Sequence, residues 1–436
     1  MRTTTSTLAE ASVAQQSARD EDTEDDDFID PATYDGKGPF IGRKSLLFLK
    51  QELLDSGVFV DTLPLGGSNL EPMEIVLREG FEPEAVKGTR RYAPAVIAAL
   101  QEEIEKQLAL GVIEECDDVP VQEVVMVKKP DSTSGFRFCI DARGVNKGVV
   151  VKPYALPPIA EILAGTAGCK YFARFDFISS YWQYPLATDS KRHTAFRALG
   201  KVYRYTRVPM GSIGASFHVQ RSNVKVLGNL YGNGAGVYID DTPIHAVTLE
   251  RFVEIIRIVV KKFADAKLYC KSSKCVIGVK SLKLLGHIID GNGIRMADDR
   301  REEVARLKFP DNPKKLRAAL GETNYQRAFI PEHALITQPL NKLVNGTTAE
   351  MNTEEARTAW KQLMRAIADQ MSLFHLDYNQ QIRVRVDASI RGVACCLFNV
   401  GVDANGERWD RLVAVCSHAF TKLKCTGRPS NKNASP

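Results

Sequence analysis

The sequence predicts an α+β protein in which helices and antiparallel hairpins occupy separate stretches of the chain. Two kinds of pattern support this class. Apolar residues recur at helical spacing over 94–110 and 249–267. Short alternating runs separated by turn residues predict hairpins at 121–140 and 381–416. At 436 residues, the chain is long enough for two or three domains with buried cores.

Helix and turn signals set the limits of the N-terminal elements. Residues 45–56 predict a short helix that ends before Gly57, and residues 94–110 predict a longer one that ends before Gly111. Glycine commonly ends a helix because it adopts the left-handed conformation without strain. The polar residues 131–135 then join the two strands of the first hairpin.

The second half of the chain continues with strands, then helices, then strands. A cluster of short strands at 274–289 precedes a mostly helical stretch at 298–375. Gln381 to Val400 alternates like one long strand, which turns at 402–406 and returns over Arg411 to Cys416. The final residues are polar and show no periodic pattern.

Charge is distributed unevenly along the chain. The formal net charge is +5, but residues 1–30 hold nine acidic side chains against two basic ones, so the remainder is more basic than the total suggests. A basic body fits a polyanionic partner, and the acidic, low-complexity segment 1–38 is typical of a disordered tail. The nine cysteines include no CxxC pair, and no secretory signal or transmembrane run is present. We therefore expect an intracellular protein, cytoplasmic or nuclear, without a membrane partner.

The adjacent carboxylates Asp240 and Asp241 are the most informative chemical feature. They lie between the apolar runs 236–239 and 242–247, so pairing of these runs would place them at a hairpin tip. Like charges repel, and a bound divalent cation gives a reason to crowd them, because Mg²⁺ prefers oxygen ligands. Taken alone, adjacent aspartates are more often a solvated turn.

A third carboxylate strengthens the metal-site hypothesis. Asp176 interrupts an otherwise apolar and aromatic, strand-like run within Cys169 to Gln183. It could cap the turn that follows, or it could face a metal ion together with Asp240 and Asp241. Tyr181 lies five residues later and would line the same wall of the site.

These residues resemble the polymerase motifs of reverse transcriptases, and those of gypsy-type LTR retrotransposons in particular. Phe175-Asp176, Tyr181 and Tyr238-Ile239-Asp240-Asp241 are similar to motifs A and C of the family. Other segments match family motifs in the same order: 127–131 and 136–147 in the fingers, 208–212 before motif B, 268–275 as motif D, 284–289 as the primer grip, 320–330 in the following helical segment, and 385–389 as the first strand of RNase H. The resemblance covers residues 75–423.

The resemblance implies a right-hand polymerase of fingers, palm and thumb with an antiparallel palm sheet, followed by a partial RNase H-like α/β domain. It implies this division of the chain: a disordered acidic N-terminus at 1–38, an N-terminal extension at 39–93, fingers and palm at 94–291, a thumb-like helical segment at 292–345, a connection and truncated RNase H-like region at 346–423, and a disordered tail at 424–436.

The resemblance also implies the chemistry. Polymerases of this family add deoxynucleotides to a primer 3′ end on an RNA or DNA template, using two Mg²⁺ or Mn²⁺ ions. Asp176, Asp240 and Asp241 would be the catalytic carboxylates. The same three residues and the carbonyl of Phe177 would hold the metal ions.

Two further groups of residues are assigned by the resemblance. The deoxynucleoside triphosphate would contact Lys129, Arg137, Tyr181, Met210, Gly211 and Lys274. Of these, Arg137 suits a phosphate best because its guanidinium can bind in a bidentate manner, and Tyr181 would exclude a ribose 2′-hydroxyl. Nucleic acid would contact Leu285 and Gly286 in the primer grip and Lys314, Lys315, Arg317 and Arg327 in the thumb. Each cation also fits an ordinary solvated surface.

Departures from the family pattern bear on activity. Met210 and Gly214 replace the residues that are usual in motif B, and Pro243 stands in the strand after the aspartate pair. Proline lacks the amide hydrogen that a ladder needs, so this strand must lie at a sheet edge or be distorted there.

The RNase H-like region is expected to be inactive in this chain. Asp387 is its only carboxylate on a matching strand, and the chain stops where the helix with the next glutamate should begin. One carboxylate cannot hold two cations in a defined geometry. Two paired strands without covering helices would also leave an exposed sheet edge.

Two functional hypotheses follow. The three aspartates favour an active RNA-directed DNA polymerase. Pro243, the changes in motif B and the short C-terminal region favour a catalytically inactive retroelement remnant that at most binds nucleic acid. An unrelated metal-dependent enzyme is a third reading with little support. The sequence predicts no particular oligomeric state.

Overall fold

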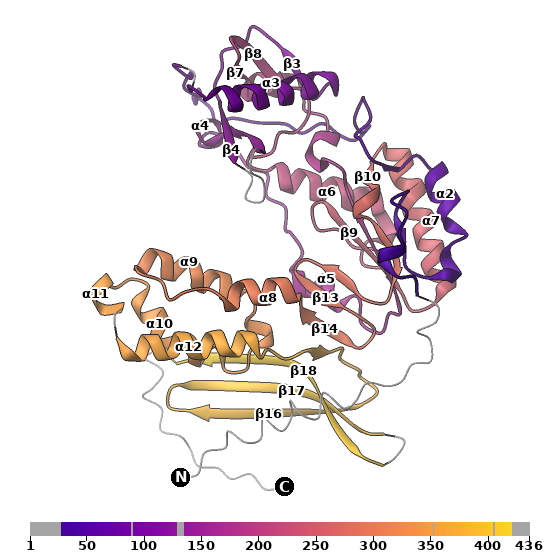
Figure 1. Cartoon of the computed structure of the whole chain (residues 1–436), viewed down its shortest axis with the longest axis vertical. Coiled ribbons are helices and arrows are strands. Elements are labelled where there is room, and N and C mark those ends of the chain that lie inside the picture. The colour runs from indigo at the N-terminus through magenta and orange to yellow at the C-terminus, as the bar shows by residue number, and fades with distance from the viewer. Residues whose placement is uncertain (1–27, 89, 129–134, 352, 404–405, 421–436) are drawn as a thin grey trace. The chain divides into compact units, whose positions relative to one another are not determined.

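The computed structural model describes residues 28–88, 90–128, 135–351, 353–403 and 406–420. Two compact units divide at Lys280 and Ser281, and we refer to them as the N-terminal and C-terminal units (Figure 1). The predicted domain boundary at 291 stays a prediction. The compact units divide before Ser281 because of strand pairing, since β13 (His287–Ile289) pairs with β14 (Gly293–Met296), which pairs with the distant β15 (Leu373–Phe374).

The N-terminal unit is built from short strands and from helices of very different lengths. Its strands are β1 (Phe40–Ile41), β2 (Phe59–Val60), β3 (Ile113–Glu115), β4 (Glu123–Lys128), β5 (Phe136–Asp141), β6 (Tyr171–Asp176), β7 (Phe196–Ala198), β8 (Lys201–Tyr205), β9 (Asp241–Ala246), β10 (Cys270–Lys271) and β11 (Val276–Val279). Its α-helices are α2 (Leu49–Asp55), α3 (Pro94–Ala109), α4 (Arg143–Asn146), α5 (Ile159–Ala164), α6 (Ala215–Leu227) and α7 (Leu249–Ala266).

A four-stranded sheet in the order β1-β11-β6-β9 forms the centre of this unit. β6 contributes Phe172 and Phe175, which are both fully buried. The ring of Phe263 on α7 lies 6.4 Å from the ring of Phe175 and 4.9 Å from that of Phe177, measured between centroids. Burial of such a side chain stabilises the fold by about 1.5–3 kcal/mol, so the strand that ends at Asp176 is anchored in the core.

The two long helices of this unit confirm the periodicity prediction. α3 begins with Pro94 and is followed by Gly111 in the left-handed region (φ 62°). α7 begins at the cap residue Thr248, whose side chain accepts a hydrogen bond from the amide of Arg251, and ends at Lys267 in the left-handed conformation. Pro94 fits the first turn of α3, because an amide hydrogen at that position would have no partner within the helix.

The predicted hairpin is confirmed as the pair β4 and β5, whose register runs from Glu123 opposite Asp141 to Lys128 opposite Phe136. The predicted turn at 131–135 lies outside the described residues except for Gly135. A separate three-stranded sheet in the order β3-β8-β7 lies in the same part of the unit.

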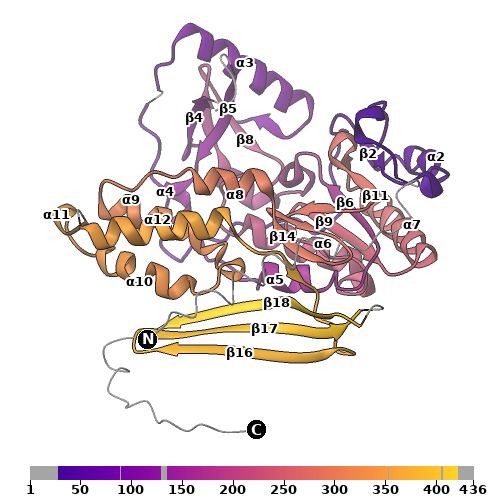
Figure 2. The same ribbon diagram turned by 60° about the horizontal axis from the view of Figure 1, so that its bottom comes forward.

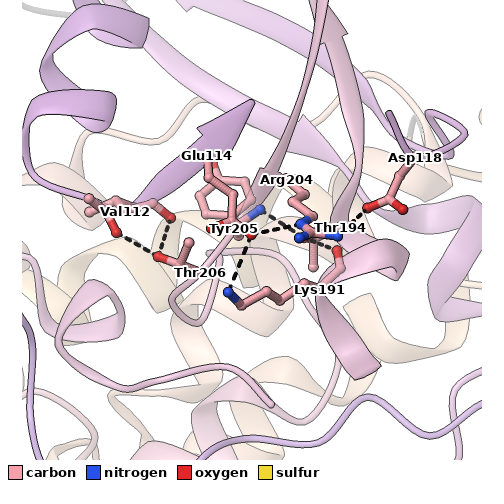
Figure 3. Close-up of polar contacts among 9 residues, drawn as sticks. Val112, Glu114, Asp118, Lys191, Thr194, Arg204, Tyr205 and Thr206 are labelled. Atoms are coloured by element: carbon pink, nitrogen blue, oxygen red, sulfur yellow. Dashed lines mark hydrogen bonds and ion pairs between the residues drawn. The ribbon is translucent and has the colours of Figure 1, made fainter. Parts of the chain in front are cut away.

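An ion-pair network joins β3, β8 and the 3₁₀ helix Thr188–Thr194 (Figure 3). Arg204 donates to Glu114 (2.8 Å) and to Asp118 (2.9 Å), and Lys191 donates to the same oxygen of Glu114 (3.3 Å). One guanidinium therefore compensates the charges of two carboxylates, one on β3 and one in the loop that follows it.

Replacing Arg204 with methionine is expected to lower the free energy of unfolding by about 1–2 kcal/mol. Two charge-assisted hydrogen bonds are lost, although the partial exposure of the pairs reduces their value. Lys201→Met is the matched control, because Lys201 forms one exposed pair with Glu115 (2.7 Å) and its loss should leave the stability nearly unchanged. Thermal unfolding of both variants checks the difference, and equal midpoints would contradict it.

Pro243 lies on β9, an edge strand of the central sheet, as the sequence predicted. The Pro243 carbonyl accepts a hydrogen bond from the amide of Gly236 (2.9 Å). The amide and carbonyl of one strand residue point to the same side, so the missing hydrogen of Pro243 faces Gly236 and not β6. The β6–β9 ladder therefore loses no hydrogen bond to the proline.

His245, also on β9, is a largely buried histidine beside Cys169, with 3.3 Å between its Nδ1 and the Cys169 Sγ. Burial lowers the pKa of His245 to about 4. The folded state therefore binds fewer protons than the unfolded state between pH 6.5 and 4, and this histidine destabilises the fold as the pH falls through that range.

We expect His245→Asn to reduce the loss of stability between pH 7 and pH 5 by roughly 1–2 kcal/mol, because the variant has no imidazole to protonate on unfolding. Thermal midpoints of the wild type and the variant at both pH values measure this difference. His418→Asn is the control, because His418 is exposed. A pH dependence that is the same in all three proteins would contradict the assignment.

The C-terminal unit has two sheets and several helices. Its strands are β12 (Leu282–Leu284), β13, β14, β15, β16 (Gln381–Ser389), β17 (Gly392–Val402) and β18 (Arg408–Ala419). Its α-helices are α8 (Asp298–Ala305), α9 (Pro313–Asn324), α10 (His333–Leu343), α11 (Thr348–Met351) and α12 (Glu354–Ala368), which agrees with the mostly helical stretch expected at 298–375.

The prediction of one strand from Gln381 to Val400 is wrong. The chain turns at Ile390-Arg391, so β16 and β17 form a hairpin and β18 pairs with β17 on the other side (Figure 2). Both halves of the predicted strand keep the same alternation, and the two turn residues are neither glycine nor proline. The periodicity therefore contained no signal for the turn.

The strand β16 is an exposed edge within the C-terminal unit. Ile382, Val384 and Val386 are exposed, at 43%, 55% and 63% of their surface. α10 packs on β18, at the other side of the three-stranded sheet. The exposed edge that the sequence predicted is thus present, in a sheet of three strands in place of two.

Candidate active site

The central sheet of the N-terminal unit places two of the predicted aspartates opposite each other. Asp176 is the last residue of β6 and Asp241 is the first residue of β9, and the two are direct partners in the antiparallel register. Directly opposed residues in such a pair have Cβ atoms about 5 Å apart. The amide of Phe177 donates to the carbonyl of Asp240 (3.3 Å), which ties the two chain segments together just beyond the strands.

Asp240 lies in a tight turn. The amide of Tyr238 donates to the carbonyl of Asp241 (2.9 Å) and the amide of Asp241 donates back (3.1 Å), so Ile239 and Asp240 form a two-residue loop. Ile239 has a φ of 58°, in the left-handed region that a β-branched residue rarely adopts. Such a conformation costs about 1–3 kcal/mol and persists only where the surroundings enforce it.

Buried side chains of α6 enforce this turn. Gln220 accepts from the amide of Ile239 (2.7 Å) and donates to the carbonyl of Val237 (2.9 Å). Asn223 donates to the carbonyl of Ile239 (2.9 Å) and accepts from the hydroxyl of Tyr184. Gln220 and Asn223 are both fully buried, so their hydrogen bonds are strong restraints on the position of Asp240.

Most of the predicted catalytic and nucleotide-binding residues of this unit line one cavity of about 520 Å³. They are Asp176, Asp240, Phe177, Tyr181, Arg137, Met210, Gly211 and Lys274. Asp241 does not line this cavity, and Lys129 lies outside the described residues. A cavity of this size that combines carboxylates, cations and aromatic rings is suited to a small charged ligand.

Two ion pairs hold the aspartates. Lys274 lies 3.4 Å from Asp176, between Nζ and Oδ1, and Arg174 lies 3.9 Å from Asp241, between Nε and Oδ1. Lys274 is exposed, whereas Arg174 is half-buried on β6. Each pair partly compensates the repulsion among the three carboxylates.

Burial raises the pKa of both aspartates in the Tyr238–Asp241 turn. The pKa of Asp240 is raised by burial and by the charge of Asp176, against its backbone hydrogen bond and Lys274. The pKa of Asp241 rises to about 6, through burial first and the other two aspartates next, although Arg174 acts in the opposite direction. Asp240 lines the cavity together with Lys274, and a carboxylate with a raised pKa beside a cation is typical of functional sites.

The carboxylates are chemically suitable ligands for a divalent cation, because Mg²⁺ and Mn²⁺ prefer hard oxygen ligands. Among the described residues, however, no group of three histidine, cysteine, aspartate or glutamate side chains is arranged to hold a metal ion. Lys274 is paired with Asp176, and Arg174 is paired with Asp241. Binding of a cation would therefore displace these ion pairs, and the convergence of the three aspartates on one metal centre stays a prediction.

The predicted primer-grip residues lie in the C-terminal unit, at the turn between β12 and β13. Leu285 and Gly286 both have positive φ, 47° and 73°. The carbonyl of Leu285 accepts from the hydroxyl of Tyr325, and the carbonyl of Gly286 accepts from the amide of Ala297 (3.0 Å). This turn is therefore fixed by contacts inside its own unit.

The predicted thumb cations differ in their surroundings. Lys315 pairs with Asp311 (2.7 Å), and Arg317 donates to the side chain of Asn345 (2.8 Å). Lys314 and Arg327 are exposed. All four lie on or next to α9.

Asp387 lies on the exposed strand β16, opposite Ala394 of β17. Its side chain is exposed, and no metal-ligating cluster includes it within the described part of the chain.

Sequence reasoning missed the residues that support the site. Gln220 and Asn223 are three apart on α6, where they occupy buried positions between Val219 and Leu227. Two other supporting residues were missed as well. Asn146 donates a hydrogen bond to the carbonyl of Gly211, and Ser216 is hydrogen-bonded to the hydroxyl of Tyr181. The one available signal was a set of polar residues at the helical spacing of a buried face, which indicates a polar network rather than a solvated face.

Residues 127–289 match the family described as "Reverse transcriptase (RNA-dependent DNA polymerase)". The chain carries a reverse transcriptase domain. The chain is also 29% identical over 304 residues to the Transposon Tf2-3 polyprotein of Schizosaccharomyces pombe and 28% identical over the same length to the Transposon Tf2-7 polyprotein of the same organism. The predicted resemblance to the reverse transcriptases of gypsy-type LTR retrotransposons is confirmed.

Coverage of these relatives is asymmetric. The alignment includes 70% of this chain but only 23% of either polyprotein, so this chain spans less than a quarter of the length of the curated relatives it matches.

Solved structures confirm the predicted α+β right-hand polymerase fold. The foamy viral protease-reverse transcriptase dRH in complex with double-stranded DNA matches with a TM-score of 0.73 at 23% identity, over 88% of this chain and 67% of that one. The foamy viral protease-reverse transcriptase in complex with an RNA/DNA hybrid matches with the same TM-score at 22% identity, over 90% and 52%. In the described part of this chain, no helix is long and apolar enough to cross a membrane.

Proposed function

We propose that this chain is an RNA-directed DNA polymerase that adds deoxynucleotides to the 3′ end of a primer paired with an RNA or DNA template. One observation carries the proposal. Within a domain of the reverse transcriptase family, a single cavity is lined by Asp176 and Asp240 together with Arg137, Lys274 and Tyr181. These are the groups that phosphoryl transfer from a nucleoside triphosphate requires.

The donor set suits two divalent ions, Mg²⁺ or Mn²⁺, which when bound supply the charge that activates the attacking oxygen and stabilises the leaving one. Asp176, Asp240 and Asp241 would hold these ions together with the carbonyl of Phe177. The register of β6 and β9 supports this assignment, because it puts carboxylates of both strands at the same end of the sheet.

The cations of the cavity would bind and orient the triphosphate. Arg137 projects from β5, and its planar guanidinium can bind two phosphate oxygens at once. Lys274 pairs with Asp176, so a cation on Asp176 would free its ammonium group for the pyrophosphate. At that place Lys274 could donate the proton that the leaving group needs.

Template and primer would contact the polypeptide through its phosphate groups. We assign Leu285, Gly286, Lys314, Lys315, Arg317 and Arg327 to these contacts. Contacts of this kind carry no base sequence information and weaken as salt is added. The basic body of the chain favours them, and because deoxynucleoside triphosphates are made inside cells, we place the activity there.

A specific observation favours the alternative, a nucleic-acid-binding protein without polymerase activity. Lys274 and Arg174 occupy two of the three aspartates, and the aspartates form no metal-binding group as they stand. If the ion pairs are too stable for a cation to displace, the domain binds nucleic acid and does not extend a primer.

Primer extension by the purified chain decides between the two. A labelled DNA primer is annealed to an RNA template and to a DNA template, and deoxynucleotides are supplied with Mg²⁺ or Mn²⁺. We expect extension on both templates, dependent on the metal. Binding of the same duplexes without any extension, with either metal and at any protein concentration, would support the alternative and refute the polymerase proposal.

A further inference from the structure

We infer that Ser216 is a positioning residue that sets the sugar selectivity of the domain by holding the ring of Tyr181 against the nucleotide cavity. The hydroxyl of Tyr181 and the Oγ of Ser216 are 2.8 Å apart, and either can be the donor. Tyr181 lines the cavity, whereas Ser216 lies behind it on α6. The inference rests on the proposed polymerase function and adds to it a residue that does not touch the nucleotide.

The main chain beneath Tyr181 is already fixed. Tyr181 lies in a 3₁₀ helix, Ser180–Gln183, which follows Ser179 in the left-handed region (φ 45°). The fully buried side chain of Gln183 donates to the carbonyls of Ile178 (2.7 Å) and Tyr269 (2.9 Å) and accepts from the amide of Tyr269 (2.7 Å). Rotation of the tyrosine side chain is therefore the freedom that remains.

The ring has room to rotate. Tyr181 is only partly buried, and the cavity of about 520 Å³ lies beside it. Packing against the hydrophobic core holds one side of the ring, but open space on the other side gives no resistance. The hydrogen bond to Ser216 supplies a restraint at the far end of the ring, where a small rotation produces the largest displacement.

Ser216 is itself held in place. It is the second residue of α6, after Ala215. The helix is preceded by Gly214, which has a φ of 86°. The loop before the helix is clamped by Asn146 at the end of α4, which donates to the carbonyl of Gly211 (2.9 Å) and accepts from the amide of Ile213 (3.0 Å). A continuous set of contacts thus leads from Asn146 through the start of α6 to the tyrosine ring.

This arrangement matters because selection against ribose works by repulsion. A ring that meets the 2′-hydroxyl rejects a ribonucleotide only if it does not yield. Without Ser216 the ring can rotate away from the 2′-hydroxyl and relieve the clash, while deoxynucleotides, which make no clash, are unaffected. Ser216 therefore acts on the ratio between the two sugars and not on the chemical step.

The test compares Ser216→Ala, Tyr181→Phe and the double variant in primer extension with deoxynucleotides and with ribonucleotides. Each single variant removes the same hydrogen bond from one side. The measured quantity is kcat/KM for deoxynucleotides divided by kcat/KM for ribonucleotides. We expect each single variant to lower this ratio by roughly three- to tenfold, which is the range that the loss of one neutral hydrogen bond corresponds to. The double variant should lower it no further, and Ser216→Thr should retain most of the wild-type ratio.

Ser222→Ala is the matched control, because Ser222 lies on α6 away from the cavity. An unchanged ratio in Ser216→Ala, or an effect of the double variant equal to the product of the two single effects, would overturn the inference.

A measurement that needs no catalysis keeps the inference testable if the chain does not extend primers. Fluorotyrosine at position 181 reports the mobility of the ring by fluorine NMR. We expect one sharp signal in the wild type and a shifted or broadened signal in Ser216→Ala, with Ser222→Ala like the wild type. The same signal in all three proteins would overturn the inference. Absence of primer extension would overturn only the proposed function.

Discussion

Asp240→Asn is expected to reduce primer extension by roughly a thousandfold or more. Asparagine keeps the shape of the side chain but removes the charge that would hold a divalent cation. Charge stabilisation by a catalytic metal is worth several kcal/mol, and each 1.36 kcal/mol corresponds to a factor of ten in rate. The turn itself should survive, because Gln220 and Asn223 bind its main chain and not the side chain of Asp240.

The loss of activity can be separated from unfolding. Burial raises the pKa of Asp240, so its charge disfavours folding and a neutral side chain should leave the thermal midpoint unchanged or higher. Asp265→Asn is the matched control, because Asp265 is an exposed residue of α7 that pairs with Lys261. Anisotropy of a labelled duplex should show equal binding by both variants. Extension by Asp240→Asn at more than a tenth of the wild-type rate would refute the catalytic assignment.

The aspartates could be predicted because their chemistry is local in sequence. Two adjacent carboxylates between apolar runs, and a third that interrupts a core strand, are visible without any knowledge of the fold. The ion pairs with Lys274 and Arg174 were not predicted, although Lys274 was named for another role. The position of a cation depends on side-chain direction across strands, and a one-dimensional pattern does not contain it.

The support for the Tyr238–Asp241 turn could not be predicted for a related reason. The positive φ of Ile239 is enforced by Gln220 and Asn223, which lie 16–19 residues earlier on a separate helix. Sequence rules assign such a conformation to glycine or asparagine, so an isoleucine in that position gives no turn signal. Strain at this residue is visible only when the helix that compensates it is placed.

Local periodicity predicted the elements better than their partners. α3, α7 and the β4–β5 hairpin follow from apolar spacing and stop signals. The turn at Ile390-Arg391 has no glycine or proline, and the unit boundary at 280 depends on β14 pairing with β15 some eighty residues later. Pairing between distant strands is set by tertiary packing, which sequence windows do not record.

Tyr181→Val is expected to lower discrimination against ribonucleotides by roughly ten- to a hundredfold while deoxynucleotide addition persists. Valine removes the ring that would overlap a 2′-oxygen in the cavity. Forcing an extra group into a filled site costs about 1–3 kcal/mol, which corresponds to a factor of about ten to a hundred when the conflict is relieved. The effect should exceed that of Ser216→Ala, because the obstacle is removed and not merely loosened. Single-nucleotide extension with each sugar measures the ratio.

The two explanations of Tyr181 predict different outcomes for the same variant. If the ring only packs against the core, valine leaves a small void and lowers stability, so extension with both sugars falls by the same factor. If the ring is a steric barrier, extension with ribonucleotides rises in absolute terms. Trp182→Leu is the control, because Trp182 lines the same cavity and packs on the same core next to Tyr181. An increase in ribonucleotide use by Tyr181→Val but not by Trp182→Leu is therefore the result that assigns sugar selection to this tyrosine.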